Sequence, residues 1–572
     1  MVREMVREKT ALIVFPPFNT PTSPPLGAAM LKGFVERELS DWRVKVFDLN
    51  LWTFDRLLTA LARGQFRLDP TAFPGGTLDA ADLLNAADAF RGKNDEEFYN
   101  RPELYNRYGE IFLHFTETYT KALTEACESH HHNGGPRSPL IQDFLDAILA
   151  QKPDVVGFSM IFSNQLPVGA LLGKILRKEY GLPVLFGGSC FADSAEHFLR
   201  WYPDSADIVV AGEGEDALKQ FLSDPSAPEK VPGAVYFEKD GSVNKVEKAY
   251  SKGIDYYGVP DFSDTNPKEY FSPSPVIPLL LSRGCYWRRC TFCVHYRSAG
   301  LTYRMHSMDF TIKMLRGFVA QGIRHFAFID EMISPPHFEK LARAIKEAEL
   351  DIAYYALTKP TKEFTSEKLL EVAESGCKYL LWGLESANQR VLDLMDKGSK
   401  IEDVSRLMKR SYAAGIANHV FMICGFPTET EGEFAQTIKF LDDHKDYIYA
   451  IHRGTFGLEP ESPIFEHPEK FGITKKWLIK DTSTGGRWGY EVSSGMSREE
   501  AARVFVGVQP FLRAFNPYAR FLANYRDHAL LIYDRLGDRV QSDKRQFPTL
   551  KFAQEPLAPW RGDELESRSL MC

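Results

Sequence analysis

The fold of this chain is decided by the stretch Gly284-Cys285-Tyr286-Trp287-Arg288-Arg289-Cys290-Thr291-Phe292-Cys293. Three of the eight cysteines lie within nine of these residues, directly after an apolar run at 277–281. Three thiolates on one loop can bind three irons of a four-iron cluster and leave the fourth iron open to a small molecule. A structural zinc site usually needs a second cysteine pair. The remaining cysteines stand alone in the sequence: Cys127, Cys190, Cys377, Cys424 and Cys572. The spacing therefore indicates an iron–sulfur site with one open position.

The pattern C-x4-C-x2-C, with Phe292 before the last cysteine, resembles the cluster loop of the radical S-adenosylmethionine (SAM) superfamily. The resemblance implies a [4Fe-4S] cluster held by Cys285, Cys290 and Cys293, with SAM bound at the open iron and cleaved to a 5′-deoxyadenosyl radical. It also implies that Phe292 lines the adenine. The commonest spacing in that family has three residues between the first two cysteines, whereas this loop has four. The alternative interpretation is three buried thiols or an adventitious metal site.

The composition fits a protein of several domains in a reducing compartment. A chain of 572 residues is expected to form roughly two to four domains. The net charge of -8, with no basic tract, argues against broad nucleic-acid binding. The apolar stretch Ala11–Phe15 is too short for a secretory signal, and no run is long enough to span a membrane. The scattered cysteines form no disulfide framework, so we expect a cytoplasmic location, which also suits an oxygen-sensitive cluster.

The first part of the chain alternates strand and helix signals. Short continuous apolar runs are typical of buried parallel strands, and helical periodicity separates them at 26–39 and 168–180. A long helical insertion is expected at about 51–142. The expected strands lie at 11–15, 44–48, 154–159, 183–188 and 206–210. This order predicts an α/β fold with a doubly wound, Rossmann-like parallel sheet, whose ligand site lies at the carboxyl ends of the strands.

Several segments at those carboxyl ends resemble a cobalamin-binding domain, the family that precedes many radical SAM barrels. They are Phe15-Pro16-Pro17, Pro24-Pro25-Leu26-Gly27, Gly187-Gly188-Ser189 and Gly212-Glu213-Gly214-Glu215. Glycines there would let the backbone approach a bulky corrin. The alternative is a flavodoxin-like sheet with ordinary glycine turns. The resemblance implies these cobalamin-binding residues: Pro17, Ser159, Met160, Ile161, Phe162, Gly187, Gly188, Ser189, Gly212 and Glu213.

The first loop lacks the histidine that ligates cobalt in some cobalamin domains. Those domains carry D-x-H-x-x-G after the first strand, whereas residues 15–20 here read Phe-Pro-Pro-Phe-Asn-Thr. We therefore expect the loop at 159–164 to cover the lower face of the corrin. His130-His131-His132 is interpreted as a surface loop, with metal or cobalt ligation as the minority alternative.

A second repeating region predicts a partial (β/α)6 barrel. It follows a hairpin signal at Asp240-Gly241 and a linker that ends near Pro275. Reactive groups of parallel barrels gather at the carboxyl ends of the strands, and the three cysteines come directly after the first strand. The expected strands lie near 279–282, 325–329, 351–356, 379–383, 418–424 and 450–455.

Three further segments of the barrel resemble SAM-contact motifs. The segment from Gly383 resembles "G-x-E-S", which implies that Glu385 or Ser386 contacts SAM; a helix cap is the alternative. Asp330-Glu331 stands where many members carry Gly-Gly-Glu, with a helix-entry cap as the alternative. The turn at Gly425 resembles "G-[FL]-P-x-E-T", which implies backbone packing near adenine, or simply a tight turn.

The expected organisation has four parts. Residues 1–225 form the cobalamin-binding domain, 226–275 the hairpin and linker, 276–465 the barrel, and 466–572 a mostly helical cap over the barrel mouth. The cap includes a helical run from Arg498 to about Leu536 and a mobile lid at 480–489.

The function expected from the resemblance is radical C-methylation. One SAM would methylate cobalamin, a second would give the radical, and an unactivated carbon would take the methyl group from methylcobalamin. An oxidative rearrangement, cyclisation or ring contraction is the alternative, and a non-catalytic iron–sulfur sensor or scaffold is a distant one. We expect a small-molecule or peptide substrate and an electron donor such as flavodoxin or ferredoxin.

Overall fold

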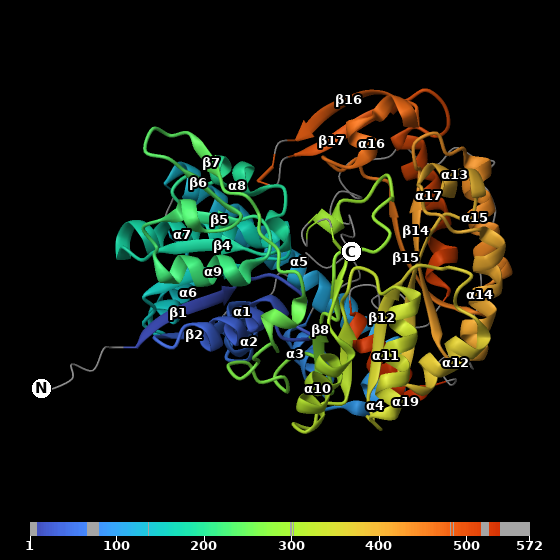
Figure 1. The fold of residues 1–572 in the computed structure, drawn as a ribbon, viewed down its shortest axis with the longest axis horizontal. Helices are drawn as coiled ribbons and strands as arrows, with labels where there is room; N and C mark the ends of the chain where they lie inside the picture. The colour runs from blue at the N-terminus through green and yellow to red at the C-terminus, as the bar shows by residue number, and fades with distance from the viewer. Residues whose placement is uncertain are drawn as a thin grey trace, which may run out of the picture.

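The computed structural model describes residues 8–65, 79–134, 137–297, 300, 302–480, 482–483, 486–515 and 525–537. Over these ranges the chain forms two lobes side by side, an N-terminal lobe in blue to green and a second lobe in yellow to orange (Figure 1). A seven-stranded sheet lies at the centre of the first lobe, and a six-stranded sheet forms the second. The α/β fold class predicted from the sequence is confirmed.

The N-terminal sheet has the strand order β2-β1-β3-β4-β5-β6-β7. Its parallel strands are β1 (Lys9–Phe15), β2 (Trp42–Asp48), β3 (Val155–Ser159), β4 (Val184–Gly187) and β5 (Ile208–Val210). The predicted hairpin also joins this sheet, because β6 (Ala234–Phe237) pairs antiparallel with β5 and carries β7 (Val243–Lys245) at the edge. The helices α1 (Leu26–Glu38) and α9 (Gly214–Ser223) cover one face, and α7 (Leu166–Tyr180) and α8 (Ala195–Trp201) cover the other.

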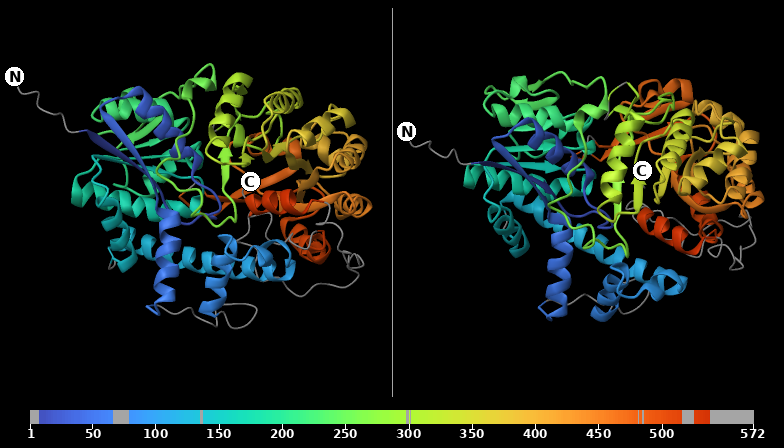
Figure 2. Two further views of the ribbon diagram at one scale, coloured as in Figure 1. Left: turned by 90° about the horizontal axis from the view of Figure 1, so that it is seen from below. Right: turned by 60° about the horizontal axis from the view of Figure 1, so that its bottom comes forward.

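The insertion after β2 is helical, as predicted, and gathers on one side of the molecule (Figure 2). Its helices are α2 (Leu49–Ala62), α3 (Ala80–Phe90), α4 (Asp95–Tyr99), α5 (Pro102–Asn133) and α6 (Pro139–Leu149). The three histidines at 130–132 form the last turn of α5, so the expectation of a surface loop is wrong. His131 is buried against the ring of Tyr202, because the chain turns only at Gly134, whose φ is +67°.

The second lobe is a partial barrel of parallel strands in the order β15-β14-β13-β12-β11-β8. The strands are β8 (Val276–Leu279), β11 (His325–Phe328), β12 (Ala353–Thr358), β13 (Cys377–Glu385), β14 (Ala417–Cys424) and β15 (Ile448–Thr455). The helices α10 (Met308–Val319), α11 (Pro335–Glu347), α12 (Ser366–Glu374), α14 (Ile401–Ala413) and α15 (Glu431–Asp443) cover its outside (Figure 1).

The first barrel strand ends earlier than predicted. β8 stops at Leu279, and the next residues form β9 (Ser282–Arg283), which pairs antiparallel with β10 (Arg304–Met305). The carboxylate of Asp330 accepts the backbone amides of Leu281 and Ser282, so these amides cannot continue the ladder with β11. The cysteine loop therefore leaves from a small two-stranded base.

The C-terminal part of the chain is helical, as predicted, and also contains a hairpin. A hairpin of β16 (Ile473–Lys480) and β17 (Arg487–Val492) lies above the two lobes in Figure 1, and α17 (Arg498–Arg513) packs beside β14 and β15. The helix α19 (Arg526–Leu536) closes the opposite, amino end of the barrel. Its Asp534 binds His325 and Lys378, which stand at the starts of β11 and β13. Of the predicted lid, residues 481, 484 and 485 lie outside the described residues, as does Trp560 of the expected cap.

Residues of α19 also reach the N-terminal lobe. The carboxylate of Asp527 accepts a hydrogen bond from the hydroxyl of Thr22 at 2.7 Å, and Tyr533 and His419 share a hydrogen bond of 2.8 Å inside the barrel.

Among the helices of the described ranges, none is both long and apolar enough to pass through a membrane.

Candidate functional site

The cysteine loop begins on a buried carboxylate. Asp330, two residues after the end of β11, is fully buried and accepts the backbone N–H of Leu281 at 3.1 Å and the N–H and hydroxyl of Ser282 at 2.5 Å each. Burial raises the pKa of this carboxyl to about 6, although the donated hydrogen bonds act in the opposite direction. Asp330 therefore fixes the start of the loop from inside the protein. Its neighbour Glu331 is half-buried and close enough to Cys293 to raise the pKa of that thiol.

The far side of the loop is fastened to the segment that follows α13 (Gln389–Leu394). Thr291 donates its amide to the carbonyl of Met395 and its hydroxyl to that of Leu394, both at 3.0 Å. The indole of Trp287 donates to the carbonyl of Asp396 at 2.7 Å, and the carboxylate of Asp396 pairs with Arg289. The loop is thus held at both ends and along its length.

The three cysteines are half-buried free thiols on this loop. The amide of Cys293 donates to the carbonyl of Cys290 at 3.3 Å, so the last two cysteines share one turn. Among the described residues, no three His, Cys, Asp or Glu side chains converge on a single metal ion. A four-iron cluster does not require such convergence, because each thiolate binds a different iron. Burial raises the pKa of Cys290 and of Cys293, so iron binding at this loop would displace protons from the thiols.

Glu385 lies beside the loop in an unusual backbone conformation. It ends β13 with a φ of +64°, and its buried carboxylate pairs with the equally buried Lys397 at 2.9 Å. Both charges act on the thiol of Cys290: the carboxylate of Glu385 raises its pKa, and the ammonium of Lys397 lowers it. A non-glycine residue at positive φ is costly and often marks a functional site. Lys397 was missed in the sequence, where no motif distinguishes it.

Ser386 does not face the loop. It is fully buried, its hydroxyl lies 3.3 Å from that of Thr437 on α15, and it accepts the amide of Asn388. Asn388 is the residue that caps α13, through the amide of Val391. The cap considered for Glu385 or Ser386 is therefore supplied by Asn388.

The turn after β14 brings Gly425 toward the loop. Gly425 has a φ of +78°, and a Cβ there would lie 2.4 Å from that of Ala501, so only glycine fits. Its amide donates to the buried carboxylate of Glu429 at 2.7 Å. Phe292 packs against the small apolar cluster that includes Phe426 of the same turn. The structure thus brings together Phe292 and the Gly425 turn, as a shared ligand environment would require.

The carboxyl edge of the N-terminal sheet is built around Gln165. Its side chain is fully buried, donates to the carbonyl of Pro16 at 2.6 Å and accepts the amides of Ile161 and Phe162. This holds the loop at 160–165 beside the Pro16-Pro17 turn. Ile161 is 41% exposed and Phe162 half-buried, so an apolar surface lies open at this edge and fits a corrin.

The other predicted cobalamin residues divide by exposure. Met160, Ser159 and Pro17 are buried and support the edge from below, whereas Gly187, Gly188, Ser189 and Gly212 are partly or fully open to solvent. Gly188 has a φ of +115°, and a Cβ there would lie 2.1 Å from the carbonyl oxygen of Met160. Gly188 therefore lets the backbone after β4 approach the loop that carries Met160, while its approach to a corrin stays a prediction.

Glu213, for which cobalamin binding stays a prediction, joins the two lobes. Its carboxylate pairs with Arg304 at 2.6 Å and Arg283 at 2.8 Å, the residues of β10 and β9 that flank the cysteine loop. Tyr257 donates a further hydrogen bond at 2.7 Å, and Glu215 binds the second nitrogen of Arg283. Burial opposes ionisation, but the arginines outweigh it and hold the pKa of Glu213 below its ordinary value. The sequence showed no partner for either arginine.

A second bridge between the lobes lies farther along the loop. Arg297 follows Cys293 by four residues and pairs with Asp193, after β4, at 3.1 Å, and also with Glu461, after β15. The cysteine loop therefore contacts the carboxyl edge of the N-terminal sheet at its base and again near its end.

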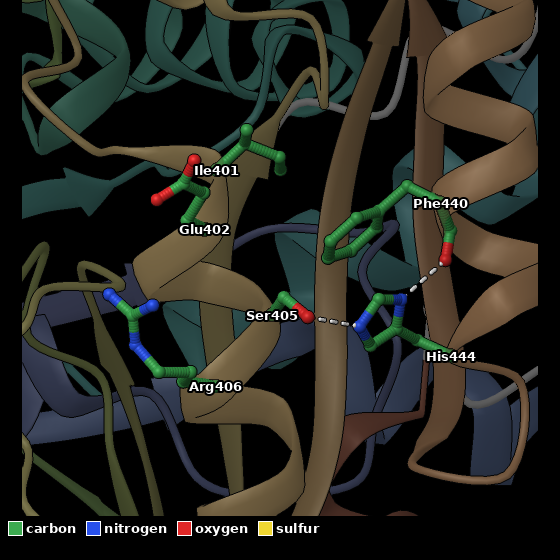
Figure 3. A pocket seen from close by; sticks show the side chains of 6 residues that line it. All are labelled: Ile401, Glu402, Ser405, Arg406, Phe440 and His444. Carbon is green, nitrogen blue, oxygen red and sulfur yellow. Dashed lines mark hydrogen bonds between the residues drawn. The ribbon is translucent and has the colours of Figure 1, made fainter.

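A shallow pocket on the outside of the barrel has a different character (Figure 3). Between α14 and α15, the hydroxyl of Ser405 lies 2.7 Å from Nε2 of His444, and Nδ1 of His444 lies 2.8 Å from the carbonyl of Phe440. A carbonyl can only accept, so Nδ1 carries the proton and Nε2 accepts from Ser405. Within the described ranges no carboxylate hydrogen-bonds to this imidazole, so the Ser405–His444 pair is interpreted as a contact between two helices.

One buried hydroxyl at the loop indicates that a ligand completes it. The phenol oxygen of Tyr286, next to Cys285, is buried and has no hydrogen-bond partner among the described residues. Buried polar groups in folded proteins are normally hydrogen-bonded. Together with three free thiols, this unsatisfied hydroxyl fits a site that holds a bound group.

Two family models match the chain, one in each lobe. Residues 121–222 match the B12 binding domain, and residues 279–441 match the radical SAM superfamily. The first match covers β3 to β5 with the helices between them, and the second begins at the end of β8 and contains the cysteine loop.

Two curated relatives are methyltransferases. An uncharacterized methyltransferase of Pyrococcus horikoshii is 26% identical over 50% of this chain and 64% of its own length. The cytidylyl-2-hydroxyethylphosphonate methyltransferase of Streptomyces wedmorensis is 29% identical over 54% of this chain and 65% of its own. The chain thus matches slightly less than two thirds of the length of each.

The fold is shared with a solved structure, the cobalamin-dependent SAM radical enzyme OxsB with aqua-cobalamin and SAM bound. The superposition covers 93% of this chain and 71% of that one, with a TM-score of 0.60 and 15% identity. The likeness extends over both lobes, including their order along the chain.

Proposed function

Because the chain belongs to the cobalamin-dependent radical SAM family, whose cofactors are a [4Fe-4S] cluster, SAM and cobalamin, we propose that it is a C-methyltransferase. When bound, these groups would supply a reductant that cleaves SAM to a 5′-deoxyadenosyl radical and a carrier for the methyl group. The acceptor would be an unactivated carbon of a small molecule or peptide.

The residues divide into three groups in this proposal. Cys285, Cys290 and Cys293 hold the irons. Glu385, Glu331, Phe292 and Gly425 surround SAM at the carboxyl ends of the barrel strands, while Asp330 and Ser386 support that surface from within. The corrin would lie on the edge formed by Ile161 and Phe162, with residues 187–189 and 212 beside it.

One observation carries the proposal: Glu213, on the edge where a corrin would bind, pairs with both arginines that flank the cysteine loop. The two cofactor surfaces are therefore neighbours, as a reaction that uses both requires. We assign residues 1–225 to cobalamin, 226–275 to the hairpin and linker, 276–465 to the radical SAM barrel and 466–572 to the substrate side. An external one-electron donor such as flavodoxin or ferredoxin would reduce the cluster, which suits the reducing cytoplasm.

The names of the two curated relatives favour methyl transfer over rearrangement, cyclisation or ring contraction. The test is anaerobic reconstitution with iron, sulfide and hydroxocobalamin, followed by reduction in the presence of SAM with a 13C-labelled methyl group. We expect a corrin absorbance band that stays with the protein through gel filtration, formation of 5′-deoxyadenosine, and label that leaves SAM for the corrin fraction.

The other interpretations predict different outcomes. If the protein binds no corrin in the presence of excess hydroxocobalamin, the proposal is overturned. If 5′-deoxyadenosine forms while the label remains on SAM, the enzyme performs a rearrangement or cyclisation. A non-catalytic sensor would yield no 5′-deoxyadenosine at all.

A further inference from the structure

The side chain of a lysine is largely buried beside the cysteine loop, and among the described residues it has no ion-pair partner. Lys359 directly follows β12 and is only 2% exposed. Across the described residues, no carboxylate lies within ion-pair distance of its ammonium, and no oxygen accepts a hydrogen bond from it. Burying an unpaired ammonium is costly unless a negative group is close by. A negative group next to Lys359 would therefore stabilise its charge.

The ammonium is held in place by the cysteine loop. It lies 3.0 Å from the centre of the Trp287 ring, one of the four residues between Cys285 and Cys290. Trp287 itself packs so tightly on Gly398 that a Cβ there would come within 2.3 Å of the ring. The carbonyl of Pro360, next to Lys359, accepts the hydroxyl of Ser399 at 2.9 Å. The segment between Cys285 and Cys290 thus supplies the aromatic face on which Lys359 lies.

Two lysines lie beside the thiols, and of these only Lys397 has a carboxylate partner among the described residues. Lys397 is its cationic neighbour, and Glu385 already neutralises Lys397. Burial lowers the pKa of Lys359 to about 8, and Lys397 lowers it further, whereas the ionised thiols of Cys290 and Cys285 act in the opposite direction. The nearest negative groups that could pair with Lys359 are therefore on the cysteine loop.

We infer that Lys359 is the counter-charge of the cluster on this loop and raises its reduction potential. The inference rests on the cluster of the proposed function. In the step concerned, an external one-electron donor passes one electron to the [4Fe-4S] cluster, which goes from the 2+ to the 1+ state; no bond breaks and no proton moves. The cluster gains one negative charge, which the nearby ammonium of Lys359 stabilises.

The test is an anaerobic redox titration of the reconstituted protein without SAM, followed by electron paramagnetic resonance at pH 7. Lys359→Met should make one-electron reduction about tenfold less favourable, a potential about 59 mV lower. Lys359→Arg keeps the charge and should stay near the parent. Lys362→Met removes an exposed lysine of the same segment and serves as the control.

Each other outcome decides against the inference. An unchanged potential in a Lys359→Met protein with full iron content overturns it, as does an equal shift in Lys359→Arg. An unchanged potential together with weaker SAM binding would assign the ammonium to the SAM carboxylate instead. A parent protein that assembles no cluster would overturn the proposed function as well, so the two failures can be told apart.

Discussion

The carboxylate of Glu213 accepts hydrogen bonds from both terminal nitrogens of Arg304, at 2.6 and 3.0 Å, across the boundary between the two lobes. Both side chains are buried, and Arg283 adds a second guanidinium to the same carboxylate. Glu215 completes a set of two carboxylates and two guanidinium groups with no net charge. The base of the cysteine loop is thus fastened to the N-terminal sheet by matched charges.

Glu213→Ala should therefore lower the free energy of unfolding by about 3–5 kcal/mol, because it leaves buried guanidinium groups without their partner. Urea denaturation followed by circular dichroism measures the change. Glu229→Ala removes an exposed carboxylate of the same lobe and should stay within about 0.5 kcal/mol of the parent. Equal stability of the two variants would contradict the role of the ion pairs.

Replacing Cys285, Cys290 or Cys293 singly with Ala should abolish cluster assembly, since each thiolate is expected to bind its own iron. Iron analysis and the visible absorbance of the anaerobically reconstituted protein measure the loss. Cys127→Ala is the matched control, because Cys127 is a buried thiol in the distant helix α5. A single variant of the three that retains the full iron content would exclude that residue as a ligand.

Gly188→Ala should weaken cobalamin binding at least about tenfold. The new Cβ would overlap the carbonyl of Met160, at a φ of +115°, and so displace the loop that presents Ile161. Absorbance titration with hydroxocobalamin gives the dissociation constant. Gly253→Ala, where nothing lies within 4 Å of the added atom, should bind like the parent. Unchanged binding by Gly188→Ala would place the corrin elsewhere.

Glu429→Gln should stabilise the protein at alkaline pH. Burial raises the pKa of Glu429 to about 7, and its Oε1 has no hydrogen-bond partner among the described residues. The folded state therefore holds a proton that the unfolded state releases above about 4.5. Stability of the parent falls as pH rises from about 4.5 to 7, by about 3 kcal/mol in all.

The variant lacks this dependence, because Gln carries no ionisable group and can still accept the amide of Gly425. Unfolding curves should give Glu429→Gln a higher free energy of unfolding than the parent at pH 8, and the difference should be smaller at pH 5. An advantage of the same size at both values would mean that the carboxyl is not the titrating group.

The strands were predictable from the sequence because continuous apolar runs reveal buried parallel strands wherever they occur. Their ends were less certain. The end of β8 depends on Asp330, which lies 49 residues away from Leu281, and the histidines at 130–132 were misplaced because the Asn-Gly-Gly turn that follows them was assumed to include them. Such errors arise where a side chain or a helix cap, not periodicity, decides the boundary.

The candidate site was predictable only where residues are close in sequence. The cysteines, Phe292 and the Gly425 turn were found through local spacing. The partners Lys397 and Arg304 were not, since an ion pair between residues 213 and 304 leaves no trace in either local sequence. For this reason the ion pairs of Glu213 could not be predicted from the sequence.

Because α19 lies near the end of the described chain, the amino end of the barrel can be closed only late in synthesis. Asp527 reaches Thr22, 505 residues earlier, and the buried faces of Tyr355, Tyr379 and His419 are covered only once α19 is in place. During translation, these side chains stay uncovered until α19 has been synthesised and can pack against the barrel. Contacts this distant slow folding. Insertion of iron before that moment would therefore meet a loop whose supporting barrel is still open at its base.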